Sequence, residues 1–590
     1  MSHAAFLPQT TETDIEYDRI VREDIELFRQ AAHRYSSGEI NDDQFRPHRL
    51  RRGIYGQRQP GVQMVRTKIP GGIATADQFA ALASIAEDFG GGKGHLTTRQ
   101  NMQYHFVPLA DVPALLHRLA DYRLTTREAC YNTVRNVTAC PLSGLLAGEP
   151  FDVQPYARTV AFAFLHKELT DSMPRKFKIA FSACQEDCML TSIHDVGLRA
   201  VIRDGRRGFR MVVGGGLGPL PSEAKLLHDF VPAEELVSHI EAVLRMFNKH
   251  GNRNNKNKAR LKFVLRERGF DWVRDQIARE LEEIRADGGI ATPECVPEGF
   301  GGFQSAPPPR GTGTDLPLAG SPAVDPAYDE WLETNVREQK QHGYAVVTVR
   351  TPRGNLTSGQ MRGIAELSRQ TGDGLVRISI DQNVHLGYIP LRNLKRVYAA
   401  LRLLDLAEAR AGEISDITTC PGAYSCNLAL TKSMNLGAAL AETVRKYDDQ
   451  AIRSLAINVS GCPNSCGQHW TGDVGFYGNA RKINGREVPY YQMLLGGGVD
   501  SEGILRFGMA IQSLPARLAP VAVERVLDHF LAHRQEAESF RAYVLRFKVE
   551  TFRSLIADLA KPDADDPEMF RDWGDEIAYS LQLGRGECAA

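Results

Sequence analysis

Two stretches of the chain carry β-branched or small residues at every second position. They are Val65, Thr67 and Ile69 in one stretch and Ala345, Val347 and Val349 in the other. Alternation of this kind predicts a β-strand. Residues with helical spacing follow each stretch, and then come a second predicted strand (95–105 and 376–388) and a short helix (112–119 and 391–401). Strands that alternate with helices predict an α+β or α/β fold.

The order of these elements recurs because the chain repeats itself. A shift of 282 residues aligns Pro70 with Pro352, Gln100-Asn101 with Gln382-Asn383, and Gly214-Gly215-Gly216 with Gly496-Gly497-Gly498. A collinear series of such matches predicts two copies of one unit. Between the copies, residues 291–330 are dense in Pro, Gly, Ser and Ala. We expect this stretch to be a linker.

Composition and charge exclude several classes of protein. Of the 590 residues, 43% are hydrophobic and 24% are charged, which excludes a disordered, collagen-like or disulfide-rich chain. The 71 Lys and Arg nearly balance the 72 Asp and Glu, so no overall field attracts nucleic acid or an anionic membrane. The N-terminus is polar, unlike a signal peptide, and no apolar run approaches the roughly 20 residues of a membrane helix. We therefore expect a cytoplasmic protein.

The second copy contains two close pairs of cysteines, Cys420 with Cys426 and Cys462 with Cys466. Two such pairs can converge on one metal centre, and four cysteines suit either a [4Fe-4S] cluster or a structural zinc ion. Spacing alone leaves both possibilities open.

The first copy retains only part of this pattern. It has Cys140, Cys184 and Cys188, but the position that corresponds to Cys426 falls near Leu146. Without a fourth ligand we expect no cluster in the first copy. Cys184 and Cys188 are then expected to be buried apolar residues, with a vestigial or redox role as the alternative.

The first copy instead carries a group of basic residues at predicted strand ends and loops. They are Arg66, Arg99, Arg135, Arg175, Lys176 and Lys178. The positions 282 residues after Arg66 and Arg99 hold Thr348 and Asp381, neither of them basic. If the copies face each other, one side of the shared interior is cationic and the other carries the cysteines. Such asymmetry suits an anionic cofactor or substrate held between the halves.

These features together resemble the sirohaem-containing sulfite and nitrite reductase family, over nearly the whole chain from about Gly53 to Ala560. The Cys-x5-Cys and Cys-x3-Cys pair carries the resemblance, joined by residues 64–72, 96–105, 135–136 and 174–178. It implies an α+β fold of two pseudo-twofold-related copies. Each copy would have a ferredoxin-like subdomain and an α/β subdomain that binds sirohaem or the cluster.

The resemblance divides the chain into seven segments. They are an N-terminal arm (1–58), a ferredoxin-like half-domain (59–125), a sirohaem-binding domain (126–290), the linker (291–330), a second ferredoxin-like half-domain (331–408), a sirohaem and [4Fe-4S] domain (409–560) and a C-terminal tail (561–590).

The resemblance also implies sirohaem and a [4Fe-4S] cluster as cofactors. The cluster ligands would be Cys420, Cys426, Cys462 and Cys466, the last of them shared with the sirohaem iron. The residues implied to face the carboxylates and the proximal side of sirohaem are Arg99, Gln103, His105, Arg175 and Asn464. A hydrogen-bonded core histidine is the alternative for His105. The residues that match the anion-binding positions of the family are Arg66, Arg135, Lys176 and Lys178.

The implied reaction is the six-electron reduction of sulfite to sulfide in sulfur assimilation. In the family, nitrite enzymes tend to carry a neutral residue at the position of Lys178, and a dianion benefits from the extra positive charge. Sulfite is therefore favoured here, with nitrite reduction to ammonia as the alternative and a non-catalytic zinc-binding protein as a remote one. The chain shows no dinucleotide or flavin motif, so a ferredoxin or a flavoprotein would supply the electrons.

Some members of the family join a tyrosine to a cysteine covalently beside the haem. The candidates here are Tyr55 and Cys130. The segment between Tyr55 and Arg66 is shorter than in the members that have this bond. A buried cysteine beside a packed tyrosine is therefore the alternative.

Overall fold

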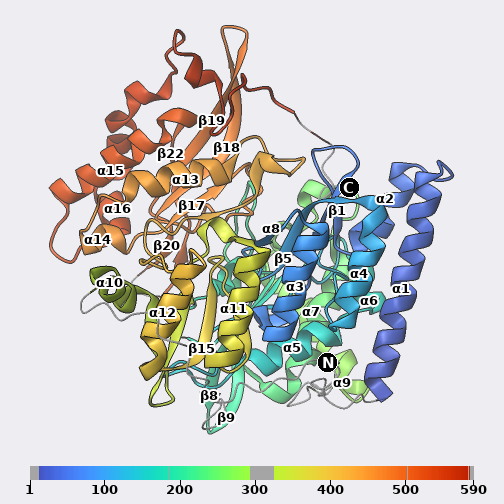
Figure 1. The fold of residues 1–590 in the computed structure, drawn as a ribbon. Helices are drawn as coiled ribbons and strands as arrows, with labels where there is room; N and C mark the ends of the chain where they lie inside the picture. Colours follow the sequence, from blue (N-terminus) through green and yellow to red (C-terminus); the bar gives the residue numbers. More distant parts are fainter. Residues whose placement is uncertain are drawn as a thin grey trace.

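The computed structural model describes residues 12–184, 186–290, 292, 325–500, 503–582 and 584. It confirms the α+β fold of two related copies (Figure 1). Most of the expected linker lies outside the described residues, as do residues 1–11 of the N-terminal arm and the last residues of the tail. Helix α10 (Pro326–Asn335) begins inside the range expected for the linker. In the described part of the chain, every helix is too short or too polar to cross a membrane.

The two copies exchange strands. The first five-stranded sheet runs β1 (Ile54–Gly56), β2 (Val62–Arg66), β5 (Met102–Pro108), β4 (Lys93–Leu96) and β13 (Asn355–Thr357). The second runs β11 (Val336–Glu338), β12 (Tyr344–Val349), β15 (Val384–Pro390), β14 (Leu375–Ile378) and β3 (Ile73–Thr75). The last strand of each sheet comes from the other copy. We call these two sheets with their helices the paired lobes.

Helices α3 (Ala76–Phe89) and α11 (Ser358–Thr371) lie side by side where the paired lobes meet (Figure 1). Each begins with a capping box, in which a threonine hydroxyl accepts from the amide three residues later: Thr75 with Gln78, and Thr357 with Gln360. The other helices of these lobes are α4 (Val112–Asp121), α10 and α12 (Leu394–Leu403). One hydrophobic core spans both paired lobes, so they form a single folded unit.

Each copy continues into a separate α/β lobe. The first α/β lobe has the sheet β10 (Lys225–Pro232), β9 (Arg206–Val213), β8 (Val196–Arg203), β7 (Ile179–Ser182) and β6 (Thr138–Ala139). Its helices are α5 (Gln154–Ala163), α6 (Glu168–Asp171), α7 (Leu236–His250), α8 (Leu261–Arg268) and α9 (Phe270–Ala286). Strands β6, β7 and β8 run parallel, and the remaining pairs are antiparallel.

The second α/β lobe repeats this arrangement. Its sheet is β16 (Thr418–Thr419), β17 (Ile457–Ser460), β18 (Val474–Ile483), β19 (Arg486–Leu495) and β22 (Met509–Pro515), with the short pair β20 (Gly498–Val499) and β21 (Leu505–Arg506) beside it. Its helices are α13 (Ser433–Val444), α14 (Gln450–Arg453), α15 (Ala519–His533) and α16 (Phe540–Leu555). Each α/β lobe has its own hydrophobic core.

The predicted strands 95–105 and 376–388 are each a hairpin instead of one strand. A turn separates β4 from β5 and β14 from β15, and Gln100 and Gln382 hold left-handed backbone conformations there (φ 57° and 68°). The buried Gln100 side-chain amide forms hydrogen bonds with the backbone of Ala139 and Ile378. The Gln382 side-chain amide forms them with the backbone of Thr419 and Leu96. These bonds tie each turn to the other paired lobe and to an α/β lobe, which continuous strands would not allow.

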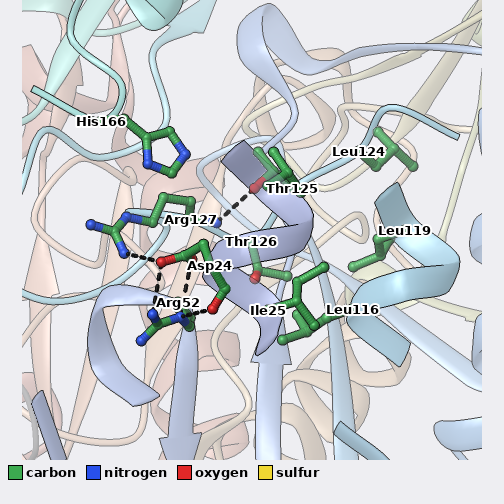
Figure 2. Close-up of a pocket in the computed structure, with 11 residues that line it drawn as sticks. Asp24, Ile25, Arg52, Leu116, Leu119, Leu124, Thr125, Thr126, Arg127 and His166 are labelled. Carbon is green, nitrogen blue, oxygen red and sulfur yellow. Dashed lines mark hydrogen bonds and ion pairs between the residues drawn. The ribbon is translucent and has the colours of Figure 1, made fainter. Parts of the chain in front are cut away.

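The N-terminal arm consists of α1 (Glu12–Ser36) and α2 (Asp42–Arg51), at the edge of the first paired lobe (Figure 1). Arg52 and Arg127 donate to the Asp24 carboxylate of α1 at 2.7 and 3.0 Å, beside a cavity of about 20 Å³ that His166 also lines (Figure 2). A cavity of this size holds about one water molecule. We therefore interpret this cavity as part of the interface that holds the arm in place.

Candidate active site

Cys420 and Cys462 lie at the ends of two paired strands of the second α/β lobe. Cys420 follows β16 directly, and Cys462 follows β17 after one residue. Because β16 and β17 are parallel, their carboxyl ends meet at the same edge of the sheet. The Gly461 amide donates to the Cys420 sulfur at 3.3 Å, and the Ser433 hydroxyl lies 3.3 Å from it. Such donors suit a thiolate that binds an iron–sulfur cluster.

The four cysteines of this lobe lie near enough to one another to interact electrostatically. Burial raises the pKa of Cys462, and the Cys466, Cys420 and Cys426 thiolates raise it further. A [4Fe-4S] cluster binds four thiolates, each to a different iron, and so offsets their charge.

A loop of the first copy reaches Cys466. The Thr98 hydroxyl, in the turn between β4 and β5, donates to the Cys466 carbonyl at 2.8 Å. The Gln468 side chain donates back to the Thr98 carbonyl at 3.5 Å. The turn that carries Arg99 is thus held against the cysteine loop.

Lys178 joins the basic residues of the first copy to this cysteine loop. It lies directly before β7, where burial lowers its pKa well below the usual lysine value. Arg99, Arg260 and Lys176 lower it further, and the Cys466 thiolate opposes them. Burial likewise lowers the pKa of Arg99 to about 9, followed by repulsion from Arg135. The structure therefore brings cationic side chains of the first copy and Cys466 of the second copy into one site.

Arg66 and Arg135 meet around Tyr55. The Arg66 guanidinium lies 5.6 Å from the centre of the Tyr55 ring and 3.8 Å from the Cys130 sulfur. With the Gln103 amide turned so that its oxygen faces Arg66, that oxygen accepts at 2.5 and 2.7 Å. Arg135 donates to the Tyr55 hydroxyl at 3.3 Å. Tyr55 and Cys130 pack in the same small buried cluster.

Arg260 is a member of the site that the sequence analysis missed. It is buried and donates to the Asp195 carboxylate at 2.8 Å, and the Lys178 amide donates to the same carboxylate at 2.9 Å. Asp195 thus holds Lys178 and Arg260 together. The repeat offered one signal, because Asp195-Val196-Gly197 aligns with Asp473-Val474-Gly475. The spacing of residues along the chain did not indicate Arg260, which lies 65 residues after Asp195.

Several buried polar atoms of the β4–β5 turn, of β5 and of the cysteine loop have no hydrogen-bond partner within the described residues. They are Arg99 Nε, both ring nitrogens of His105 and of His469, and the Ser465 hydroxyl. Burial lowers the pKa of His105 to about 3, so this ring is neutral. Buried polar groups are nearly always satisfied, so these atoms need a partner that the protein does not supply. A large polar cofactor such as sirohaem, rimmed with carboxylates, fits this requirement.

Two further residues that were expected to bind sirohaem are more exposed than Arg135 and Gln103. Arg175 is half-buried and donates to the Asn132 side chain at 3.3 Å. Asn464 is exposed beside Cys462 and Ser465.

The expectation that Cys184 and Cys188 are both buried apolar residues is wrong. Cys184 is half-buried and Cys188 is exposed, while Cys140 is buried. Cys184 and Cys188 lie in the turn after β7, outside the strand, whereas Cys140 directly follows β6.

Two family models match the chain, each of them twice. The model described as "Nitrite and sulphite reductase 4Fe-4S domain" matches residues 130–285 and 411–562, which together are more than half of the chain. The model described as "Nitrite/Sulfite reductase ferredoxin-like half domain" matches residues 55–122 and 337–404. The duplicated matches agree with the repeat found in the sequence.

Individual proteins are similar over most of the chain. A ferredoxin–nitrite reductase of Synechococcus elongatus is 30% identical, covering 82% of this chain and 91% of that protein. An assimilatory ferredoxin-dependent nitrite reductase of Haloferax mediterranei is 28% identical, covering 90% and 89%. Among solved structures, the Mycobacterium tuberculosis NirA protein superposes with a TM-score of 0.73 at 25% identity, covering 87% of this chain and 92% of that one.

Proposed function

The chain belongs to the nitrite and sulfite reductase family, and from that premise we propose that it reduces nitrite to ammonium with electrons from a ferredoxin. Its cofactors are sirohaem and a [4Fe-4S] cluster. The sequence favoured sulfite because of Lys178, but the relatives just described are named as ferredoxin-dependent nitrite reductases. These relatives favour the alternative over sulfite. The balanced reaction is NO2⁻ + 6 e⁻ + 8 H⁺ → NH4⁺ + 2 H2O.

One observation supports the reduction of an anion at this site, whether nitrite or sulfite. The Thr98 hydroxyl of the first copy donates to the Cys466 carbonyl of the second at 2.8 Å, and the Cys466 thiolate acts on the pKa of Lys178, as do Arg99, Lys176 and Arg260. A small anion bound near Cys466 would therefore meet concentrated positive charge. Such charge, placed where an oxyanion binds, stabilises the anion and the negative charge that develops during its reduction.

The residues of the site divide between the two cofactors. We propose that Cys420, Cys426, Cys462 and Cys466 bind the cluster, with Cys466 shared with sirohaem. The residues that would face the sirohaem carboxylates are Arg99, Gln103, His105 and Arg175, with Asn464 beside the cysteine loop. When bound, sirohaem and the cluster supply the electron path and the iron at which the anion reacts.

The remaining basic residues would bind the anion and deliver protons. Arg135 donates to the Tyr131 and Ala129 carbonyls at 3.0 and 2.9 Å, which fixes its guanidinium. Fixed donors need no reorganisation when charge develops on the substrate. Arg66, Lys176 and Lys178 complete the set, and the lysine ammonium groups can donate protons as each oxygen leaves as water.

Steady-state kinetics with dithionite-reduced methyl viologen tests the proposal without the natural donor. We expect kcat/KM for nitrite to exceed that for sulfite by about tenfold or more, because the site must then favour the transition state of nitrite reduction. A higher kcat/KM for sulfite would restore the sulfite reading. Activity with neither anion in a preparation that contains both cofactors would refute both.

Lys178→Asn tests how the site discriminates between the two anions. We expect kcat/KM to fall about a hundredfold for sulfite and about tenfold for nitrite, because the dianion loses more electrostatic stabilisation. Lys482→Asn removes an exposed lysine of β18 and serves as the control. Equal losses for both anions would contradict this role of Lys178.

A covalent bond between Tyr55 and Cys130 stays a prediction. The bond would replace a ring C–H and the thiol S–H, with two electrons and two protons passing to dioxygen. Peptide mass spectrometry should then find the two peptides joined, with two hydrogens lost. Two separate peptides, with Cys130 open to alkylation after denaturation, would show a packed but unlinked pair.

A further inference from the structure

The first α/β lobe brings three cysteines together at the carboxyl ends of its parallel strands. Cys140 follows β6, and Cys184 and Cys188 lie in the turn after β7. The Cys188 amide donates to the Cys184 sulfur at 3.3 Å, and the Ser182 hydroxyl lies 3.6 Å from it. Cys140 lies beside this turn, because its amide donates to the Phe181 carbonyl of β7 at 3.0 Å. We call this group the thiol triad.

The triad is a different kind of site from the four cysteines of the second copy. There the amide that donates to a cysteine sulfur belongs to Gly461, whereas here it belongs to another cysteine, Cys188. The backbone thus holds the Cys184 sulfur against the residue that carries the Cys188 thiol. Such a pair suits chemistry of the sulfur atoms themselves.

We propose that Cys140, Cys184 and Cys188 form a peroxide-reactive thiol site, in which Cys184 is oxidised and then joined to a neighbouring cysteine by a reversible disulfide. Cys188 is exposed and Cys184 is half-buried, so this turn is open to a small hydroperoxide from solvent. The resolving thiol of Cys188 belongs to the residue whose amide contacts the Cys184 sulfur at 3.3 Å. Redox-sensing cysteines typically combine exposure, a stabilised thiolate and a nearby second thiol.

The charges within the triad agree with Cys184 as the nucleophile. Hydrogen bonds from Cys140 and Cys188 lower the pKa of Cys184 to about 2. Interaction with Cys184 raises the pKa of Cys140 to about 12, and interactions with Cys140 and Cys184 raise the pKa of Cys188. These directions favour Cys184 as the thiolate of the group.

The proposed oxidation balances in two steps. The Cys184 thiolate attacks hydrogen peroxide and breaks its O–O bond, which yields a sulfenic acid and hydroxide. The thiol of Cys188 or Cys140 then attacks the Cys184 sulfur, forms the S–S bond and releases water. A dithiol reductant returns both thiols by exchange. Hydrogen peroxide is the two-electron oxidant of the cycle.

Thiol trapping on the holoenzyme tests the proposal. The protein is treated with about one equivalent of hydrogen peroxide, alkylated under denaturing conditions and mapped by mass spectrometry. We expect the Cys184 peptide to lose two hydrogens in a disulfide with Cys188 or Cys140, and dithiothreitol to reverse this. Full alkylation of Cys184 after peroxide treatment, with oxidation elsewhere, would overturn the proposal.

Substitutions separate the roles within the triad. Cys184→Ser should prevent disulfide formation among the remaining two cysteines, because the nucleophile is lost. In the double variant Cys140→Ser and Cys188→Ser, Cys184 should accumulate as a sulfenic acid that dimedone traps. A thermal unfolding transition like that of the parent protein shows that each variant is folded. A Cys140–Cys188 disulfide that forms equally fast in Cys184→Ser would contradict the assignment of Cys184.

Discussion

The two α/β lobes have the same arrangement of strands and differ in the side chains at equivalent positions. Strands β6 and β7 of the first lobe and β16 and β17 of the second are parallel pairs that lead into cysteines. The second lobe carries four cysteines at this edge, and the first carries three, with the Cys188 amide against the Cys184 sulfur. The first lobe instead supplies the positive charge around Cys466. The two copies thus use one arrangement of strands, and their side chains give the first copy basic groups and the second its four cysteines.

The same comparison between the lobes applies to the aspartates that directly precede β8 and β18. Asp195 accepts a hydrogen bond from the Lys178 amide just before β7. Asp473 accepts one from the Ala456 amide just before β17, and both distances are 2.9 Å. Asp195 also pairs with Arg260, whereas burial raises the pKa of Asp473 to about 6. A buried carboxylate that lacks a cation is costly when charged. Arg260 thus supplies the buried Asp195 carboxylate with a cationic partner in the first lobe.

The cysteines should give the largest difference between the lobes. We expect Cys462→Ser to lose most of its iron and acid-labile sulfide, with activity reduced by roughly a thousandfold or more, because a cluster ligand is removed. Cys184→Ser, at the equivalent position of the first lobe, should keep the iron and visible absorbance of the parent protein. Iron analysis and absorbance spectra decide this. Equal iron loss in both variants would mean that the first lobe also binds a cluster.

Arg260 should give the next largest effect. We expect Arg260→Leu to lower the free energy of unfolding by about 3–5 kcal/mol, because Asp195 keeps a buried charge without its partner. Arg206→Leu is the control, since it breaks an exposed pair with Glu234 and should cost less than about 1 kcal/mol. Denaturant unfolding measures both changes.

A second substitution sharpens this prediction. Adding Asp195→Asn to Arg260→Leu removes the stranded charge, so part of the lost stability should return. If Arg260→Leu unfolds like the parent protein, the pair does not stabilise the first lobe.

The turn glutamines should give the smallest effect, and an equal one in both copies. Gln100→Asn and Gln382→Asn keep a residue suited to the left-handed conformation but are too short to make the buried hydrogen bonds. We expect each variant to lose about 1–3 kcal/mol of unfolding free energy. Denaturant unfolding of the two variants side by side measures this. A loss confined to one variant would show that the copies are not equivalent at this seam.

Local patterns in the sequence determined much of this protein. The alternation at Val65 to Ile69, the shift of 282 residues and the spacing of Cys420, Cys426, Cys462 and Cys466 are all visible in the chain itself. They predicted the α+β class, the duplication and the family. Strand periodicity and the spacing of ligands within each cysteine pair are local patterns, and the repeat is visible by comparing the sequence with itself.

Tertiary structure alone decided the rest. The exchange of β3 and β13 depends on how the copies pack, and the split of residues 95–105 into a hairpin depends on the partners of Gln100. Arg260 joins Lys178 only through Asp195, and three cysteines become a triad only because two parallel strands end side by side. Such contacts join residues far apart in the chain. Their formation depends on strand register and packing, which residue spacing does not encode.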